Sequence, residues 1–171
     1  MPADRVPGTA GGGKNATFSP CRRWRYTLER ETGTGGDLAV AFIGLNPSTA
    51  DELNDDPTIR RCVDFARRWG YGKLVMLNLF AWRATDPREL SNVFDPRGAG
   101  SLSALEHWHG LCDKTIAAWG NIGRLEGRDG YVREILQRQK PLYHLGLTKY
   151  GMPRHPLHLK ATTLPTLWAT P

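Results

Sequence analysis

Residues 38–51 read LAVAFIGLNPSTAD, and this stretch decides the fold class of the chain. It opens with an apolar run, residues 38–43, that ends at Gly44 before it is long enough to form a helix. Such a run, without alternating polar residues, is typical of a strand that is buried on both faces in a parallel sheet. Open parallel sheets bind ligands at the carboxyl ends of their strands, where Asn46, Pro47 and Ser48 follow this run. Glycine, asparagine and proline are also ordinary turn residues, so this stretch alone indicates either a turn or a binding site.

The rest of the chain repeats this alternation of apolar runs with helical patterns. Asp56-Pro57 has the features of a helix start, an acidic cap followed by proline, and apolar residues then recur at helical spacing up to Gly70. Alternating strands and helices indicate right-handed crossovers and a sheet with helices on both faces. We therefore predict an α/β fold, a three-layer sandwich around a central, mostly parallel sheet of four to five strands. The predicted strands cover residues 38–44, 74–79, 115–119 and 142–145.

The two ends of the chain carry weaker patterns. Residues 1–17 contain a glycine-rich segment and lack apolar periodicity, so we expect a disordered tail, followed by a single domain over residues 18–171. Residues 25–31 alternate weakly and precede a glycine-rich turn, which predicts a hairpin with the strand that begins at residue 38. Residues 163–168 are expected to form a short final helix.

The composition is typical of a cytoplasmic globular protein. No apolar stretch approaches the ~18–20 residues of a membrane span, and the first twenty residues lack the apolar core of a secretion signal. Cys21, Cys62 and Cys112 are widely spaced and odd in number, which indicates reduced thiols and disfavours a disulfide or an iron–sulfur cluster. His107 and His109 fall on different faces of a predicted helix, so we interpret them as surface residues. We expect no metal site, no cofactor and no membrane partner.

The charge of the chain is mildly basic. Lysine and arginine number 23 against 17 aspartate and glutamate, which gives a formal net charge of +6. This charge is compatible with a nucleic-acid partner but does not require one. We predict that Arg22, Arg23 and Arg25 contact the phosphates of a nucleic-acid backbone. A second arginine cluster, over residues 60–68, is explained by a solvated helix face, and nothing in the sequence indicates the oligomeric state.

Polar and aromatic side chains follow three of the predicted strands at their carboxyl ends. A fourth loop near the end of the chain places a histidine before a proline, which holds the histidine in an extended backbone. Because the carboxyl ends of parallel strands share one edge of a sheet, we predict that these side chains line one cleft. The groups are Asn46-Pro47-Ser48, Asn78 with Phe80 and Trp82, Trp119-Gly120-Asn121, and Arg154-His155-Pro156.

The motifs GLNPS after the first core strand and HPLHL near the end resemble motifs of the uracil-DNA glycosylase superfamily. The resemblance implies a glycosylase-like fold in which Asn46 positions the attacking water and Asn78 binds the edge of the base. It also implies that His155 donates a hydrogen bond to the base oxygen that gains negative charge. The longer stretches NPSTAD, DDPTIRRC and NLFAWRATDP resemble the domain of unknown function 1643 family more closely, over roughly residues 22–160.

The residues and the resemblance lead to a hypothesis: hydrolysis of the N-glycosidic bond of a nucleobase, in DNA or in a nucleotide. The predicted catalytic residues are Asn46 and His155. The predicted substrate-binding residues are Gly44, Leu45, Pro47, Ser48, Asn78, Phe80, Trp82, Trp119 and Arg154. Two alternatives remain open: a non-catalytic domain that binds nucleic acid or a nucleotide, and a small-molecule transferase or hydrolase that uses Ser48 and Asp51.

Overall fold

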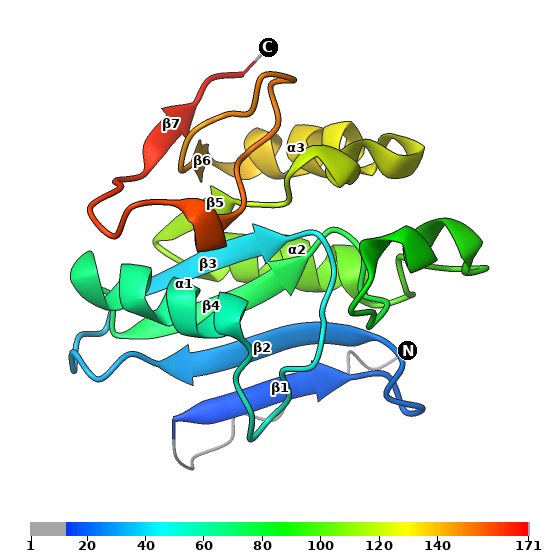
Figure 1. Ribbon diagram of the computed structural model, residues 1–171. Helices are drawn as coiled ribbons and strands as arrows, with labels where there is room; N and C mark the ends of the chain where they lie inside the picture. Colours follow the sequence, from blue (N-terminus) through cyan, green and yellow to red (C-terminus); the bar gives the residue numbers. More distant parts are fainter. Residues whose placement is uncertain (1–12, 171) are drawn as a thin grey trace.

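The computed structural model describes residues 13–170, and its central element is one mixed sheet of seven strands in the order β1-β2-β4-β3-β5-β6-β7 (Figure 1). The strands are β1 (Lys14–Phe18), β2 (Arg25–Glu31), β3 (Ala39–Gly44), β4 (Lys73–Asn78), β5 (Lys114–Ala117), β6 (Leu142–His144) and β7 (Thr166–Trp168). The helices are α1 (Pro57–Arg68), α2 (Ser101–Leu111) and α3 (Arg128–Gln139), with the 3-10 helices η1 (Pro87–Asn92), η2 (Asn121–Gly127) and η3 (Pro156–His158).

The α/β class predicted from the sequence is confirmed, and the sheet is larger and more mixed than predicted. The pairs β4–β3, β3–β5 and β5–β6 are parallel, whereas β1–β2, β2–β4 and β6–β7 are antiparallel. The prediction of four to five strands is too low because β1 and β7 were not expected. β1 begins at Lys14, inside the stretch predicted to be a tail, and residues 1–12 of that stretch lie outside the described residues.

The predicted hairpin between residues 25–31 and the strand that begins at residue 38 is wrong. β2 pairs antiparallel with β4 instead, with Leu28 opposite Met76, because both edges of β3 are occupied by the parallel strands β4 and β5. The glycine-rich segment carries the chain across the sheet to reach this order. There the backbones of Gly36 and Gly72 approach so closely that a Cβ atom on Gly72 would collide with the Gly36 carbonyl.

The predicted helix over residues 163–168 is also wrong, because the segment ends in strand β7. β7 pairs antiparallel with the free edge of β6, and its last residue, Trp168, is buried against Trp119 with ring centroids 5.6 Å apart. An open sheet edge and a buried aromatic side chain thus outweigh the local helical preference of this short segment.

The alternation of side chains along the central strands builds one core on each face of the sheet. One core joins Ile43 and Leu77 to residues of α2 and α3, and the other joins Phe42 and Met76 to residues of α1. Figure 1 shows α1 on one face and α2 and α3 on the other, which makes the three layers. None of the helices in residues 13–170 is long and apolar enough to cross a membrane.

His109, which we interpreted as a surface residue, is completely buried between α2, β5 and α3. Its Nδ1 lies 2.8 Å from the Thr115 hydroxyl, and its Nε2 lies 3.1 Å and 3.2 Å from the carbonyl oxygens of Leu136 and Lys140. Two carbonyl acceptors at Nε2 require the proton there, so Nδ1 accepts the hydrogen bond from Thr115. His107 is exposed, as expected.

Candidate functional site

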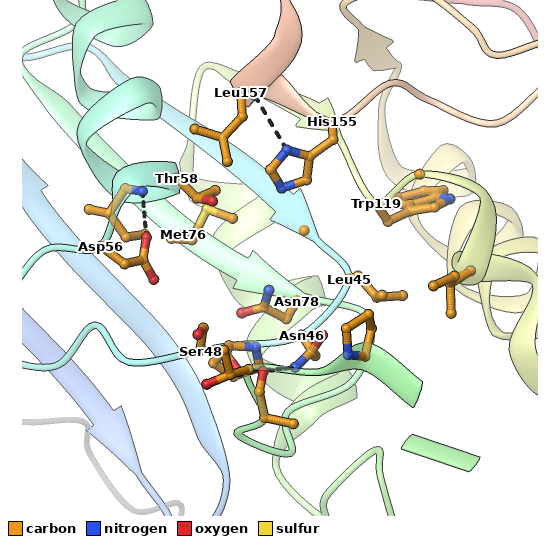
Figure 2. Close-up of a pocket in the computed structure, with 18 of the residues that line it drawn as sticks. Leu45, Asn46, Ser48, Asp56, Thr58, Met76, Asn78, Trp119, His155 and Leu157 are labelled. Carbon is orange, nitrogen blue, oxygen red and sulfur yellow. Dashed lines mark hydrogen bonds between the residues drawn. The ribbon is translucent and has the colours of Figure 1, made fainter. Parts of the chain in front are cut away.

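A pocket of about 400 Å³ opens at the carboxyl ends of β3, β4 and β5, on the side of the sheet that α1 covers. Figure 2 shows its side chains, which come from strand ends, from the start of α1 and from the loop before η3. The predicted residues that line it are Gly44, Leu45, Asn46, Pro47, Ser48, Asn78, Trp119, Gly120, Asn121 and His155. The structure therefore brings together residues from four separate parts of the chain, as the strand-end argument predicted.

Three predicted substrate-binding residues do not line this pocket. Phe80 is completely buried in the core beneath α2 and α3, because the chain bends after β4 and directs this ring away from the pocket. Trp82 packs edge-on against Trp24, with ring centroids 5.2 Å apart, and Arg154 is exposed beside Gly146. Of the three aromatic residues predicted to bind substrate, Trp119 is therefore the one that lines the pocket.

Gly44, the last residue of β3, leaves the room in which Asn78 sits. A Cβ atom at Gly44 would lie 2.8 Å from the Met76 Cε atom and 2.9 Å from the Asn78 Nδ2 atom, so a larger residue would displace both side chains. Gly44 and Asn78 are partners in the parallel register of β3 and β4. The floor of the pocket therefore depends on a glycine at this strand end.

The Asn46 side chain has a fixed orientation. Its Nδ2 atom donates to the carbonyl oxygens of Pro47 at 3.0 Å and Ala84 at 2.9 Å, with the Trp82 carbonyl at 3.5 Å. Three carbonyl oxygens around one atom identify that atom as the amide nitrogen. The Oδ1 atom faces the other way, and an amide oxygen can accept two hydrogen bonds from a water molecule or a ligand.

Arg25 lies in the pocket lining, and the prediction that it contacts phosphates at the surface is wrong. Its side chain is 2% exposed, and it donates from Nη1 to the Ala50 carbonyl at 3.0 Å and from Nη2 to Asn78 Oδ1 at 3.3 Å. Burial lowers the pKa of Arg25 to about 10, although Asp56 opposes the shift. Because β2 pairs with β4, the guanidinium reaches the strand end from the neighbouring strand.

The contact with Arg25 determines how Asn78 faces a ligand. An arginine donates only, so the atom that accepts from it is the amide oxygen of Asn78 and the free end is Nδ2. Figure 2 shows the Asn78 amide and the His155 ring directed into the same hollow. Asn78 therefore offers hydrogen-bond donors to the pocket, which suit a carbonyl oxygen on the ligand.

His155 presents a neutral ring to the pocket. Its Nδ1 atom accepts a hydrogen bond from the Leu157 backbone N–H at 3.3 Å, so the proton of the neutral ring lies on Nε2. Burial lowers the pKa of His155, His158 lowers it further, and Asp56 opposes them. At neutral pH the ring is therefore an uncharged donor whose Nε2 faces the hollow (Figure 2).

Asp56 is a pocket residue that the sequence analysis assigned only to a helix cap. Its carboxylate accepts from the Ile59 N–H at 2.9 Å, as the cap of α1 requires, and it lines the pocket as well. The signal was present, because a helix that follows a parallel strand begins at the same edge as the strand end. Asp51, by contrast, accepts from Leu53 and Asn54 within its own loop.

The two remaining arginines of the predicted cluster stay at the surface. Arg22 forms a two-point ion pair with Glu52, at 2.7 Å and 2.8 Å, which raises the pKa of Arg22 and lowers that of Glu52. Arg23 is exposed. Both lie beside the pocket and not inside it.

Comparison with known proteins identifies a family. The sequence model of a family described as a protein of unknown function (DUF1643) matches residues 25–157, which include all of the strand ends at the pocket and His155. No curated protein and no solved structure matches the chain.

Proposed function

The chain belongs to the DUF1643 family, and we propose that its pocket binds a nucleobase and hydrolyses the bond between that base and its sugar. One observation carries the proposal: Asn46, Asn78, Trp119 and His155 line a single hollow of about 400 Å³. Pockets of about 300–1,000 Å³ hold small ligands, and an aromatic wall with a few fixed polar groups suits a planar base.

The roles of the residues follow from their free atoms. The donors of Asn78 and the Nε2–H of His155 would bind carbonyl oxygens on the base, which favours bases that carry such oxygens over bases that carry only amino groups. Water adds to the sugar carbon while the bond from that carbon to the base nitrogen breaks. The bonding electron pair moves onto the base and its carbonyl oxygen, where a fixed donor stabilises the charge, and the proton of the water passes to solvent or to the departing base.

Asn46 would position the water, because its oxygen can accept a hydrogen bond while its nitrogen is held by backbone carbonyls. An amide is a weak base, and in this reaction placing the water matters more than removing its proton, since the departing base leaves a cation-like sugar. The resemblance to the uracil-DNA glycosylase superfamily supports the same roles for Asn46, Asn78 and His155, and suggests that the α/β fold is of that type.

The direct test is release of free base from a panel of deaminated and modified bases. The substrates are single-stranded DNA, double-stranded DNA and free nucleosides, each incubated with the intact chain and with Asn46→Ala. We expect release with the intact chain and a loss of about 100-fold or more with the variant. His107→Ala is the matched control, since His107 is exposed on α2 and outside the pocket. Turnover of no substrate in the panel would reject the catalytic proposal.

A second candidate is binding of a nucleotide or nucleic acid without chemistry. It is favoured by the hydrogen bonds from Asn46 to the loop at residues 82–84. These bonds give the Asn46 side chain a structural role that does not require catalysis. Ligand binding without base release in the same panel would support this candidate. A hydrolase built on Ser48 and Asp51 has less support, because Asp51 does not line the pocket.

A further inference from the structure

A second hollow of about 470 Å³ adjoins the pocket and opens to solvent. We name it the arginine groove, and its lining residues are Arg22, Arg23, Ser48, Thr49, Arg83, Ala84, Thr85 and Glu89. Ser48, Ala84 and Thr85 line both hollows, so the groove and the pocket share a wall. The two hollows are therefore adjacent, as the base and the phosphate of one nucleotide are.

The groove is assembled from three segments of the chain, residues 22–23, 48–49 and 83–89, and direct contacts join the first to the third. An isolated antiparallel bridge joins Trp24 to Trp82, and the Arg83 N–H donates to the Arg23 carbonyl at 2.9 Å. The Arg83 guanidinium also donates to the Arg22 carbonyl, at 3.2 Å. Arg22 adopts a left-handed backbone (φ 59°), which is uncommon for a residue with a side chain. These contacts hold the arginines in place before any ligand arrives.

The positive charges of the groove are only partly balanced. The guanidiniums of Arg22 and Arg83 both lie over the Phe18 ring, 3.9 Å and 4.9 Å from its centre. Glu52 neutralises Arg22, whereas within residues 13–170 neither Arg23 nor Arg83 forms an ion pair. Glu89 lines the same groove and offsets part of this charge. Arg23 and Arg83 therefore carry positive charge that no ion pair in this part of the chain neutralises, and this charge would stabilise a bound anion.

Hydroxyl groups complete the lining. Ser48, Thr49 and Thr85 line the groove, and in the described part of the chain their hydroxyls make no hydrogen bond to another protein group. Arginine and hydroxyl side chains are the common partners of phosphate oxygens, which accept charge-assisted hydrogen bonds. The composition of the groove thus matches a phosphate better than a carboxylate, which has only two oxygens to bind.

We infer that the arginine groove binds the phosphate of the nucleotide whose base occupies the pocket. The inference rests on the proposed function, because it assigns the pocket to a base. It names the ligand as a phosphorylated nucleoside and not a free base or nucleoside. A monophosphate and a phosphate within a strand share this chemistry, and the arms of the experiment below separate them.

The experiment measures dissociation constants by titration calorimetry at low salt. The probes are deoxyuridine, deoxyinosine and deoxyguanosine, their 3′- and 5′-monophosphates, and a single-stranded oligonucleotide with one deoxyuridine. At least one monophosphate should bind about tenfold more tightly than its nucleoside, since one charge-assisted hydrogen bond contributes that much. A larger gain with the oligonucleotide identifies a strand as the source of the phosphate, and no larger gain identifies a free nucleotide.

The variants are Arg83→Met and Arg23→Met, which should abolish the gain from the phosphate and leave nucleoside affinity unchanged. Arg138→Met is the control, because it removes one exposed positive charge on α3 outside both hollows. Arg83→Lys, which keeps the charge, should retain part of the gain. Equal binding of nucleosides and monophosphates would overturn the inference while the pocket assignment stands. Absence of binding by every probe would overturn both.

Discussion

Two histidines with a lowered pKa lie in different regions of this molecule, and they differ in what their ring atoms contact. His109, between α2 and α3, uses both nitrogens on protein groups: the Thr115 hydroxyl and two backbone carbonyls. His155, above the pocket, uses only Nδ1, and its Nε2 faces the hollow. In both, burial lowers the pKa, so the uncharged ring is favoured in the folded chain.

The comparison shows that a lowered pKa does not by itself identify a functional histidine. Both histidines share this property, because His109 is completely buried and His155 is partly buried. The distinguishing feature is a polar atom without a protein partner at the wall of a hollow, since such an atom is available to a ligand. By this criterion His155 belongs to the candidate site and His109 belongs to the core.

The largest expected effect is on catalysis at His155. If the chain is a glycosylase-like enzyme, His155→Ala should lower turnover by about 100-fold or more, because one donor to a developing oxyanion contributes roughly 2.7–4 kcal/mol to lowering the barrier. The midpoint of urea unfolding should change little, since the ring makes one hydrogen bond to its own loop. Turnover comes from the base-release assay, with His107→Ala as the control. Unchanged turnover in an active enzyme would contradict the role assigned to the free Nε2 atom.

The central strands of the sheet were predicted from the sequence more accurately than its edges. Each of the four predicted central strands overlaps an observed strand, because continuous apolar runs leave few alternatives to a buried strand. The edges were predicted poorly. β7 is three residues long and exists because β6 has a free edge, and β2 was assigned to the wrong neighbour because its own residues do not encode its partner.

The errors at the site follow from the same limit. The strand-end rule correctly brought Asn46, Asn78 and His155 to one edge, since parallel strands share it. It failed for Phe80, because the face on which a residue lies after a strand ends depends on the bend of the chain. The prediction from arginine clustering failed for Arg25, because the approach of this side chain to Asn78 requires the β2–β4 pairing. Short-range patterns locate loops, whereas side-chain direction depends on tertiary contacts.

The second largest expected effect is on stability, at His109 in the core. His109→Ala should lower the free energy of unfolding by about 2–4 kcal/mol, because it leaves a cavity and removes the hydrogen-bond partner of buried groups. Activity per folded molecule should stay near that of the unchanged chain. Urea unfolding followed by tryptophan fluorescence measures the first quantity, and the base-release assay at low temperature measures the second. A His109→Ala variant that is stable but inactive would contradict the assignment of a structural role to His109 and a catalytic role to His155.

The third effect concerns the dependence of stability on pH. Because the pKa of folded His109 lies below the ordinary value of 6.5, the unfolded chain takes up this proton first as the pH falls. The stabilisation is therefore complete above about pH 6.5 and declines as the pH falls toward the folded pKa. His144 and His155 act in the same direction, so the comparison needs a variant. Unfolding at several pH values should show a smaller loss on acidification in His109→Gln than in the unchanged chain. An equal loss in both proteins would assign the effect to other groups.

The smallest expected effect applies the same criterion to carboxylates. Asp51 accepts hydrogen bonds from Leu53 and Asn54, which lower its pKa, and it lies outside the pocket lining. Asp51→Asn should therefore change turnover by less than about twofold, as expected for a surface group whose contacts are local.

Asp56→Asn is the informative variant for comparison, because asparagine also caps a helix but removes the negative charge that opposes the lowered pKa of His155. The measurement is the pH profile of turnover for both variants. With Asp56→Asn, the acidic limb should move to lower pH, because the neutral ring then persists further into acid. If Asp51→Asn abolishes turnover while His155→Ala leaves it intact, a transferase or hydrolase that uses Ser48 and Asp51 becomes the better hypothesis. A polar atom without a protein partner would then not identify the functional residues of this pocket.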